Sequence, residues 1–432
     1  MSSHNIRVLM ADDSAVIRRL LSEALAPDKE LEVVGVGRHG GEALQLSVAQ
    51  RPDVILLDVE MPVMDGVEAV VAIRKLDAHI PIIMFSSITT RGGTATLDAL
   101  SAGANDYVTK PVSLGHASEA MTYIRNELIP KIKLWGRRHR RRSTGMPASL
   151  LVPTTPGFPR SPNMPPNITP TAGAAPPAMP KSLLAPTTPG FPHSPNMPPN
   201  ITPTAGAAPP TMPGKPRDPA CAIEIVAIGS STGGPNALAE VLKRIPHGFP
   251  VPIVITQHMP PVFTQLLAQR LNSICPLNVR EGVEGAILKP GDVWVAPGNF
   301  HMTVQMDQAD RVLHLDQKPH ENSCRPAVDP LFRSVATAYG GRCLGVVLTG
   351  MGRDGEMGSK AIRQVGGRII AQDEESSVVW GMPRAVAQAG YAGQVLPLNQ
   401  IAVEIVDMVR RTQVLAKDTN MQKPGLRPAM AR

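Results

Sequence analysis

Short apolar runs alternate with helix-length amphipathic segments from residue 1 to about residue 130. The runs are RVLMA, LEVVGV, DVILLD, PIIMFS and DYVT, at residues 7–11, 31–36, 53–58, 81–86 and 106–109. Apolar runs this short are typical of strands buried on both faces of a sheet. Because a helix-length segment follows each run, we predict a doubly wound parallel sheet, that is, an α/β domain, over residues 1–130.

The same alternation returns between residues 220 and 412. Strands are predicted for EIVAIGS, VPIVITQH, DVWVAPG, CLGVVLTG and GRIIAQ, at residues 224–230, 251–258, 292–298, 343–350 and 367–372. Helices are expected from Pro235, Pro261, Pro326, Gly355 and Pro383. We therefore predict a second α/β domain with a mainly parallel sheet over residues 220–412. The polar tail, residues 413–432, lacks periodicity and is predicted to be disordered.

A duplicated proline-rich segment separates the two regions. The sequence that begins at Leu150 recurs from Leu183, and proline occurs throughout both copies. Because proline fixes φ and lacks an amide hydrogen, neither helix nor sheet can propagate through such a segment. A basic run, KIKLWGRRHRRR at residues 131–142, precedes it. We predict an extended linker over residues 131–219, in which the basic run is the solvated tail of a helix. A proline-motif docking site, and a nucleic acid or an acidic partner for the basic run, are the alternatives.

Composition narrows the class of protein. The net charge of +7 suits a nucleic-acid partner, but only 3% of residues are aromatic, too few for a base-stacking surface. An acidic protein partner explains the charge equally well. No apolar stretch approaches the roughly 20 residues of a membrane helix, and the four cysteines are widely spaced without a CxxC pair. We expect a protein of the reducing cytoplasm, with no nucleic-acid binding, membrane insertion, zinc site or disulfide scaffold.

Charged and hydroxyl residues lie where the predicted strands of the first domain end. Asp12 and Asp13 follow the first run, Asp58 ends the third, Ser86 ends the fourth and Lys110 follows the fifth. Because sites in parallel α/β sheets form beyond the carboxyl ends of the strands, we expect these side chains to lie together. Crowded carboxylates suit Mg²⁺, and one of them can attack a phosphoryl donor while the lysine and the hydroxyl contact the new phosphate.

The motifs ADDS, LLDVEMPVMDG and VTKP at these strand ends closely resemble the receiver domains of two-component response regulators, whose fold is flavodoxin-like. The resemblance covers the whole first domain. It implies that Asp58 is the phospho-acceptor, that Ser86 is the switch hydroxyl and that Lys110 contacts the phosphate. It also implies a Mg²⁺ site for phosphorylation, formed by Asp12, Asp13, Asp58 and the backbone carbonyl of Glu60.

A glycine-rich turn follows the first predicted strand of the second domain. Its sequence, GSSTGG at residues 229–234, satisfies G-x-S-x-G, in which small residues permit the sharp turn that exposes a nucleophilic serine, here Ser231. On the motif alone, a phosphate-binding turn is an equally good interpretation, although neither GxGxxG spacing nor a P-loop lysine is present. His258 ends the next predicted strand and can supply a base. The orienting carboxylate can come from Asp354, which alone is no better a candidate than Asp292, Asp329 or Asp373.

Six motifs together resemble the catalytic domain of the chemotaxis protein-glutamate methylesterases: IGSSTGGP, ITQHMPPVFT, VAPGNFHMTV, RPAVDPLF, LTGMGRDG and VVWGMPRA. The resemblance spans nearly all of residues 222–410. It implies that Ser231 is the nucleophile, His258 the general base and Asp354 the residue that orients the base. The backbone amides expected to stabilise the oxyanion are those of Thr232 and Met351. The chain order Ser, His, Asp differs from that of α/β-hydrolases, so that fold is not assigned.

The combined resemblance implies a phosphorylation-activated enzyme that hydrolyses glutamate methyl esters on methyl-accepting chemotaxis receptors and deamidates receptor glutamines, giving sensory adaptation. A chemotaxis histidine kinase is the implied phosphodonor, and the esterase itself needs no cofactor. Cys324, in the loop before Pro326, is interpreted as structural. Two other functions stay open: a DNA-binding response regulator, although no helix-turn-helix pair is predicted after Pro219, and an inactive adaptor that only binds receptors.

Overall fold

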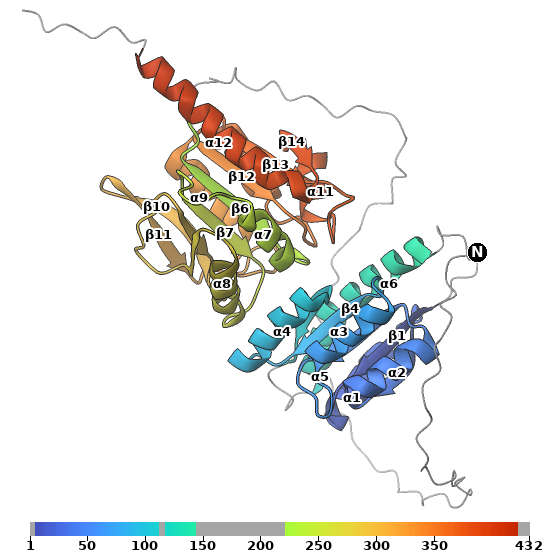
Figure 1. The fold of residues 1–432 in the computed structure, drawn as a ribbon. Coiled ribbons are helices and arrows are strands. Elements are labelled where there is room, and N and C mark those ends of the chain that lie inside the picture. The colour runs from blue at the N-terminus through green and yellow to red at the C-terminus, as the bar shows by residue number, and fades with distance from the viewer. Residues whose placement is uncertain (1–4, 112–116, 144–220, 422–432) are drawn as a thin grey trace, which may run out of the picture. The chain divides into compact units, whose positions relative to one another are not determined.

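The computed structural model describes residues 5–111, 117–143 and 221–421 (Figure 1). The duplicated proline-rich segment, from residue 150 to residue 213, lies outside the described residues, so the predicted extended linker stays a prediction. Among the helices that the structure describes, none combines the length and the apolar character needed to cross a bilayer.

The first domain is built on a parallel sheet of five strands. They lie in the order β2-β1-β3-β4-β5, the order of flavodoxin-like folds. All five predicted strands are confirmed, namely β1 (Ile6–Ala11), β2 (Leu31–Gly37), β3 (Val54–Asp58), β4 (Ile82–Ser86) and β5 (Asp106–Thr109). Strands β3 and β4 are buried along their whole length, because helices cover both faces of the sheet.

Helices follow each strand of this sheet. They are α1 (Ala15–Leu25), α2 (Gly40–Gln50), α3 (Gly66–Leu76), α4 (Thr90–Ala102) and α5 (Ala117–Tyr123). Local sequence sets their starts: Ser14 caps α1, and Asp65 forms a capping box with Glu68 at α3. After α5 the chain continues through a π-helical turn, η1 (Ile124–Leu128), into α6 (Ile129–Ser143).

Helix α6 corrects the predicted end of the first domain at residue 130. The basic run lies within this helix, and its apolar residues Ile132 and Trp135 are buried in the same core cluster as β1, α1 and η1. Their spacing of three places them on one face of the helix. The run therefore packs as part of the first domain, which continues past residue 130 at least as far as residue 143.

The basic side chains of α6 have acidic partners within the domain. Lys133 Nζ lies 2.7 Å from Asp28 Oδ2, and Arg140 Nη2 lies 2.6 Å from Asp53 Oδ2. Arg137 forms an ion pair with Glu30. These ion pairs neutralise basic side chains that could otherwise have bound a nucleic acid or an acidic partner. This part of the basic run therefore connects α6 to the rest of the first domain.

The second domain contains a parallel sheet of seven strands in the order β14-β13-β12-β6-β7-β9-β8. The predicted strands are confirmed as β6 (Ile225–Ser230), β7 (Ile253–Gln257), β9 (Asp292–Val295), β12 (Cys343–Val347) and β13 (Arg368–Gln372). The structure adds β8 (Asn278–Glu281) and β14 (Gln394–Leu396) at the two edges, and a separate antiparallel hairpin, β10 (His301–Asp307) with β11 (Asp310–Asp316). The domain is therefore α/β with a parallel main sheet, as predicted.

Helices cover this sheet on both faces (Figure 1). One face carries α7 (Gly234–Lys243), α8 (Phe263–Ile274) and α12 (Leu398–Met421), and the other carries α9 (Val328–Tyr339), α10 (Glu356–Gln364) and α11 (Met382–Gln388). The five helices that were predicted, α7 to α11, begin within two residues of their predicted starts. The predicted disorder from residue 413 is wrong up to Met421, because α12 continues its helical pattern past the buried Thr412.

We expect Trp135→Ala to lower the free energy of unfolding of the first domain by about 3–5 kcal/mol, because a large buried side chain leaves a cavity. Val48→Ala, at an exposed apolar position of α2, is the matched control and should change stability by less than about 0.5 kcal/mol. Urea unfolding followed by circular dichroism measures both. Equal midpoints for the two variants would show that α6 does not contribute to this core.

Candidate active site

Three neighbouring strands of the second domain bring the predicted catalytic residues together. Ser231 follows β6, His258 follows β7 and Asp354 lies in the loop after β12. Strand β6 lies between β12 and β7. The sheet extends from β6 through β7 and β9 on one side and through β12, β13 and β14 on the other, so the direction of strand addition changes at β6. This is the switch point at which parallel α/β sheets form their sites.

The turn that carries Ser231 is held by backbone hydrogen bonds. Ser231 N–H donates to Thr349 O over 3.0 Å, and Gly234 N–H donates to Ser231 O over 2.7 Å. Gly233 has a φ of 78°, which favours glycine, and a Cβ on Gly234 would lie 1.9 Å from Gln257 Oε1. The glycines of GSSTGG are thus required for a tight strand-to-helix turn, which the sequence motif predicted.

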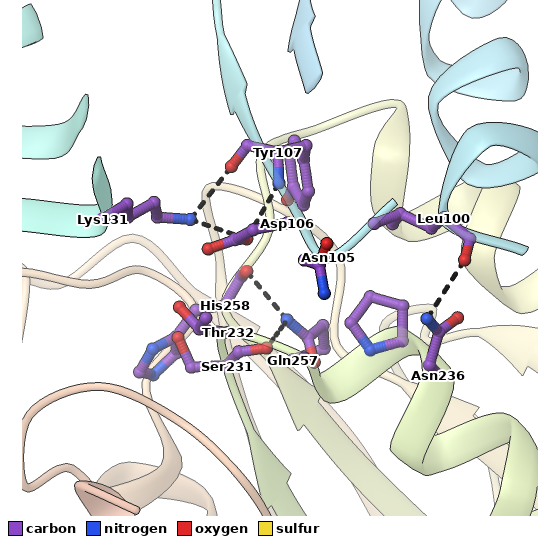
Figure 2. Close-up of a pocket in the computed structure, with 12 residues that line it drawn as sticks. Leu100, Asn105, Asp106, Tyr107, Lys131, Ser231, Thr232, Asn236, Gln257 and His258 are labelled. Carbon is purple, nitrogen blue, oxygen red and sulfur yellow. Dashed lines mark hydrogen bonds and ion pairs between the residues drawn. The ribbon is translucent and has the colours of Figure 1, made fainter. Parts of the chain in front are cut away.

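Gln257 connects this turn to the histidine, a role that sequence reasoning missed. Its Nε2 donates to Ser231 O over 3.0 Å and to His258 O over 3.1 Å (Figure 2). Its Oε1 accepts from the buried Ser230 hydroxyl over 2.7 Å. Gln257 directly precedes His258 in the motif ITQHMPPVFT. A polar residue at the end of a buried strand is the feature of the sequence that could have indicated this role.

His258 and Asp354 form a short hydrogen bond. His258 Nε2 lies 2.7 Å from Asp354 Oδ2, and the two side chains are 12% and 2% exposed. This bond fixes the orientation of the imidazole and leaves Nδ1 as the nitrogen free of the carboxylate. Between the described residues, no hydrogen bond joins Ser231 Oγ to His258. The nearest recorded partner of Nδ1 is the sulfur of Cys324, at 3.5 Å.

Asp354 is surrounded by donors. Its oxygens accept from the backbone amides of Val328 at 2.6 Å, Asp329 at 3.0 Å and Gly355 at 2.9 Å, and from Asn322 Nδ2 at 2.8 Å. Val328 and Asp329 form the first turn of α9, where the helix dipole favours a negative charge. Burial would raise the pKa of Asp354, but the His258 ring and these amides hold it below its ordinary value, so the carboxylate is ionised.

The pKa of His258 is shifted upward. Burial alone would lower the pKa of the ring, but the hydrogen bonds to Asp354 and Cys324 outweigh burial and raise it above its ordinary value of 6.5. The surroundings therefore favour the imidazolium, the form that a histidine acquires when it takes a proton from a nucleophile.

The structure distinguishes the aspartates that the sequence left equivalent. Of these four aspartates, only Asp354 is hydrogen-bonded to the His258 ring within the described part of the chain. The carboxylate of Asp329 shares the Asn322 amide with Asp354, and the pKa of Asp329 is raised to about 6 by burial and by the charge of Asp354. Asp292 pairs with Arg280, and Asp373 accepts from Ser376.

The two predicted oxyanion donors are both available. Thr232 and Met351 each follow a strand end next to Ser231, and within the described part of the chain their backbone N–H groups donate to no other group. The amide of Ser231 itself is occupied by Thr349 O. Gly350, the residue before Met351, packs closely against Ser231, since a Cβ there would lie 2.9 Å from Ser231 Cβ.

The acidic residues of the first domain gather at the carboxyl edge of its sheet. Asp12, Asp13 and Asp58 each offer an oxygen within 4.8 Å of the others, a set that suits a divalent cation. Lys110 Nζ lies 2.8 Å from both Asp12 Oδ2 and Asp58 Oδ2. Burial and the charge of Asp12 raise the pKa of Asp58 to about 6, and Lys110 only partly offsets them.

The remaining predicted residues border this acidic cluster. Ser86 is buried at the end of β4, where its hydroxyl donates to Gly92 O over 3.1 Å, and its carbonyl accepts from Lys110 N–H over 2.7 Å. Glu60 follows two residues after Asp58, and its N–H donates to Asp58 Oδ1 over 3.4 Å. The fold therefore brings Asp12, Asp13, Asp58, Ser86 and Lys110 to one edge of the sheet.

Both domains of the chain match known protein families. Residues 8–122 match the family described as response regulator receiver domain, and residues 226–405 match CheB methylesterase. A protein-glutamate methylesterase/protein-glutamine glutaminase of Trichodesmium erythraeum is 43% identical over 400 residues, covering 93% of this chain and 98% of that relative. A relative of the same name from Nocardioides sp. is 42% identical over 426 residues, 99% of each chain.

Among solved structures, the CheB methylesterase catalytic domain of Thermotoga maritima is 43% identical, covers 43% of this chain and 99% of its own, and has a TM-score of 0.43. The full-length identity to curated relatives establishes the relationship. With a receiver domain ahead of a CheB methylesterase domain, this chain belongs to the family of protein-glutamate methylesterase/protein-glutamine glutaminases.

Proposed function

We propose that this chain hydrolyses glutamate methyl esters, and deamidates glutamines, on methyl-accepting chemotaxis receptors, with Ser231, His258 and Asp354 as its catalytic residues. The observation that carries the assignment is the 2.7 Å hydrogen bond between His258 and the buried Asp354, at the same sheet edge as the glycine-rich turn of Ser231. A nucleophile, a base and a group that orients the base are the parts that serine hydrolysis needs.

Acylation begins when Ser231 Oγ attacks the ester carbonyl of the glutamate side chain. Because Asp354 occupies Nε2 of His258, Nδ1 is the nitrogen that accepts the proton of Ser231. A bond forms between Oγ and the carbonyl carbon, and the carbonyl oxygen becomes an oxyanion that the amides of Thr232 and Met351 stabilise. The tetrahedral intermediate collapses, and methanol leaves with the proton that His258 returns to it.

Water completes the reaction. His258 Nδ1 takes a proton from a water molecule, whose oxygen attacks the acyl carbon, and the bond to Ser231 Oγ breaks as that oxygen regains a proton. The product is a free glutamate side chain. A glutamine substrate follows the same steps, with ammonia leaving in place of methanol.

The first domain supplies the control. We assign Asp58 as the residue that a chemotaxis histidine kinase phosphorylates, Lys110 as the phosphate contact and Ser86 as the switch hydroxyl. Asp12, Asp13, Asp58 and the Glu60 carbonyl would hold Mg²⁺, which shields the negative charges that otherwise repel a phosphoryl donor. We infer that the unphosphorylated receiver inhibits the esterase domain, and that phosphorylation of Asp58 relieves this inhibition by changing the charge at this edge.

We expect Ser231→Ala to reduce methanol release from methylated receptor membranes by about three orders of magnitude or more, because the nucleophile is lost. Ser230→Ala is the matched variant: its buried hydroxyl bonds Gln257 and faces no substrate, so turnover persists while stability falls by about 1–3 kcal/mol. Loss of turnover in Ser230→Ala with retention in Ser231→Ala would reassign the nucleophile.

We expect Asp58→Asn to abolish the activation of the full chain by a small phosphodonor, while basal methanol release persists. Chelation of Mg²⁺ should abolish both phosphoryl incorporation and activation in the unaltered chain, because the carboxylates then repel the donor. Glu32→Gln, at an exposed position of β2, is the control and should respond normally. Normal activation of Asp58→Asn would contradict the assignment of the acceptor.

A further inference from the structure

A tight turn at residues 321–324 lies against the catalytic pair. Glu321 N–H donates to Cys324 O over 3.1 Å, and Cys324 N–H donates to Glu321 O over 2.9 Å. The two central residues, Asn322 and Ser323, have φ values of 52° and 62°. Positive φ at both central positions is the geometry of a type I′ turn, in which asparagine is favoured.

Side-chain interactions on both flanks hold this turn in place. Glu321 forms two hydrogen bonds of 2.6 Å with the guanidinium of Arg333 on α9. Arg325 donates to the carbonyls of Gln317 and Lys318 and to Asn299 Oδ1. Bidentate and multiple arginine contacts of this kind fix geometry better than single hydrogen bonds do. The turn can therefore hold its side chains at defined positions.

Asn322 places its amide between two buried carboxylates. Its Nδ2 lies 2.8 Å from Asp354 Oδ1 and 2.9 Å from Asp329 Oδ2. Both hydrogens of the amide are thus used, one on each carboxylate. This bridge offsets the repulsion between the two groups and sets the plane of the Asp354 carboxylate, whose other oxygen accepts from His258 Nε2.

Cys324 contacts the second ring nitrogen of His258, the one that Asp354 does not bind. Its Sγ lies 3.5 Å from His258 Nδ1, the nitrogen that takes the proton of Ser231 in the proposed mechanism. The sulfur can accept the Nδ1 hydrogen when the ring is charged, which stabilises the imidazolium and agrees with the raised pKa of His258. The sequence suggested only a structural cysteine here, because nothing in the chain order places residue 324 beside residue 258.

We propose that the turn at residues 321–324 positions the catalytic pair from both ends, with Asn322 orienting Asp354 and Cys324 holding the ring of His258 at Nδ1. Neither residue touches the reacting atoms of the ester, so both are positioning residues. The inference rests on the proposed roles of Ser231, His258 and Asp354 and adds to them the residues that fix the geometry of the base.

The turn should also affect how the rate of hydrolysis depends on pH. The titratable groups around His258 are Asp354 after β12, Cys324 in the turn and, through Asn322, Asp329 of α9. Cys324 contributes to the upward shift of the pKa of His258. Removing the sulfur should therefore lower the pKa of the base, so that the rate rises toward its plateau at lower pH.

The test measures kcat/KM for methanol release by the full chain across pH. Asn322→Gly keeps the left-handed turn but removes the amide, and we expect kcat to fall about 10- to 100-fold with little change in KM. Cys324→Ala should move the acid limb of the profile to lower pH by roughly one unit. Cys324→Ser, which restores a polar atom near Nδ1, should return the acid limb toward its original position.

Two substitutions serve as matched controls. Ser323→Gly changes the exposed neighbour in the same turn, and Cys275→Ala removes a cysteine whose sulfur faces Leu277 O at the end of α8. Both should keep the rate and pH profile of the unaltered chain. Circular dichroism and the melting temperature identify any variant that fails to fold, and the other position of the turn then carries the test.

The outcomes separate this proposal from the function it builds on. If Ser231→Ala is inactive while Asn322→Gly and Cys324→Ala keep the original kcat and acid limb, the turn has no positioning role and the assignment of the nucleophile stands. If Ser231→Ala stays active, the proposed mechanism itself fails. A fall in kcat for Asn322→Gly together with a shifted acid limb for Cys324→Ala supports the proposal.

Discussion

A buried negative charge on Asp354 is the constraint that organises the esterase domain. An ionised carboxylate that is 2% exposed needs several donors, because it has lost its contact with water. The fold supplies them from the start of α9, from Gly355, from the turn that carries Asn322 and from His258. Elements far apart in the sequence are thus fixed by one carboxylate, and the orientation of the His258 ring follows from it.

In the receiver, the buried carboxylates are only partly neutralised by their neighbours, in contrast to Asp354. Asp58 lies beside Asp12, and Lys110 is shared between the two, so the negative charges are only partly compensated. The pKa of Asp58 is accordingly raised, to about 6, whereas that of Asp354 is held low. Partial compensation leaves a site that gains free energy from a cation, and full compensation leaves a rigid support for a base. The same chain therefore contains one buried carboxylate suited to binding a cation, Asp58, and one suited to holding a histidine in place, Asp354.

Much of this could be predicted from the sequence, because strand ends of parallel sheets converge and residues such as Asp58, Ser231 and His258 stand directly at them. Contacts set by tertiary packing could not. The basic residues of α6 resemble a solvated tail until Asp28 and Asp53 are seen beside them. The edge strands β8 and β14 are short and partly exposed, so their apolar pattern is weak. Asn322 reaches Asp354 across a sequence separation that no local pattern encodes.

The strand order also explains why glycine is needed next to Ser231. Strands β7 and β12 flank β6 on opposite sides, yet His258 from one and Asp354 from the other meet at 2.7 Å. The chain after β12 must therefore pass the end of β6, where Ser231 lies, and Thr349 O accepts the Ser231 amide there. Gly350 is the next residue, and any Cβ would lie 2.3 Å from Met382 Sδ and 2.9 Å from Ser231 Cβ. A glycine at this crossing lets Asp354 approach His258 without displacing Ser231, so the arrangement of these three residues depends on a missing side chain as much as on those present.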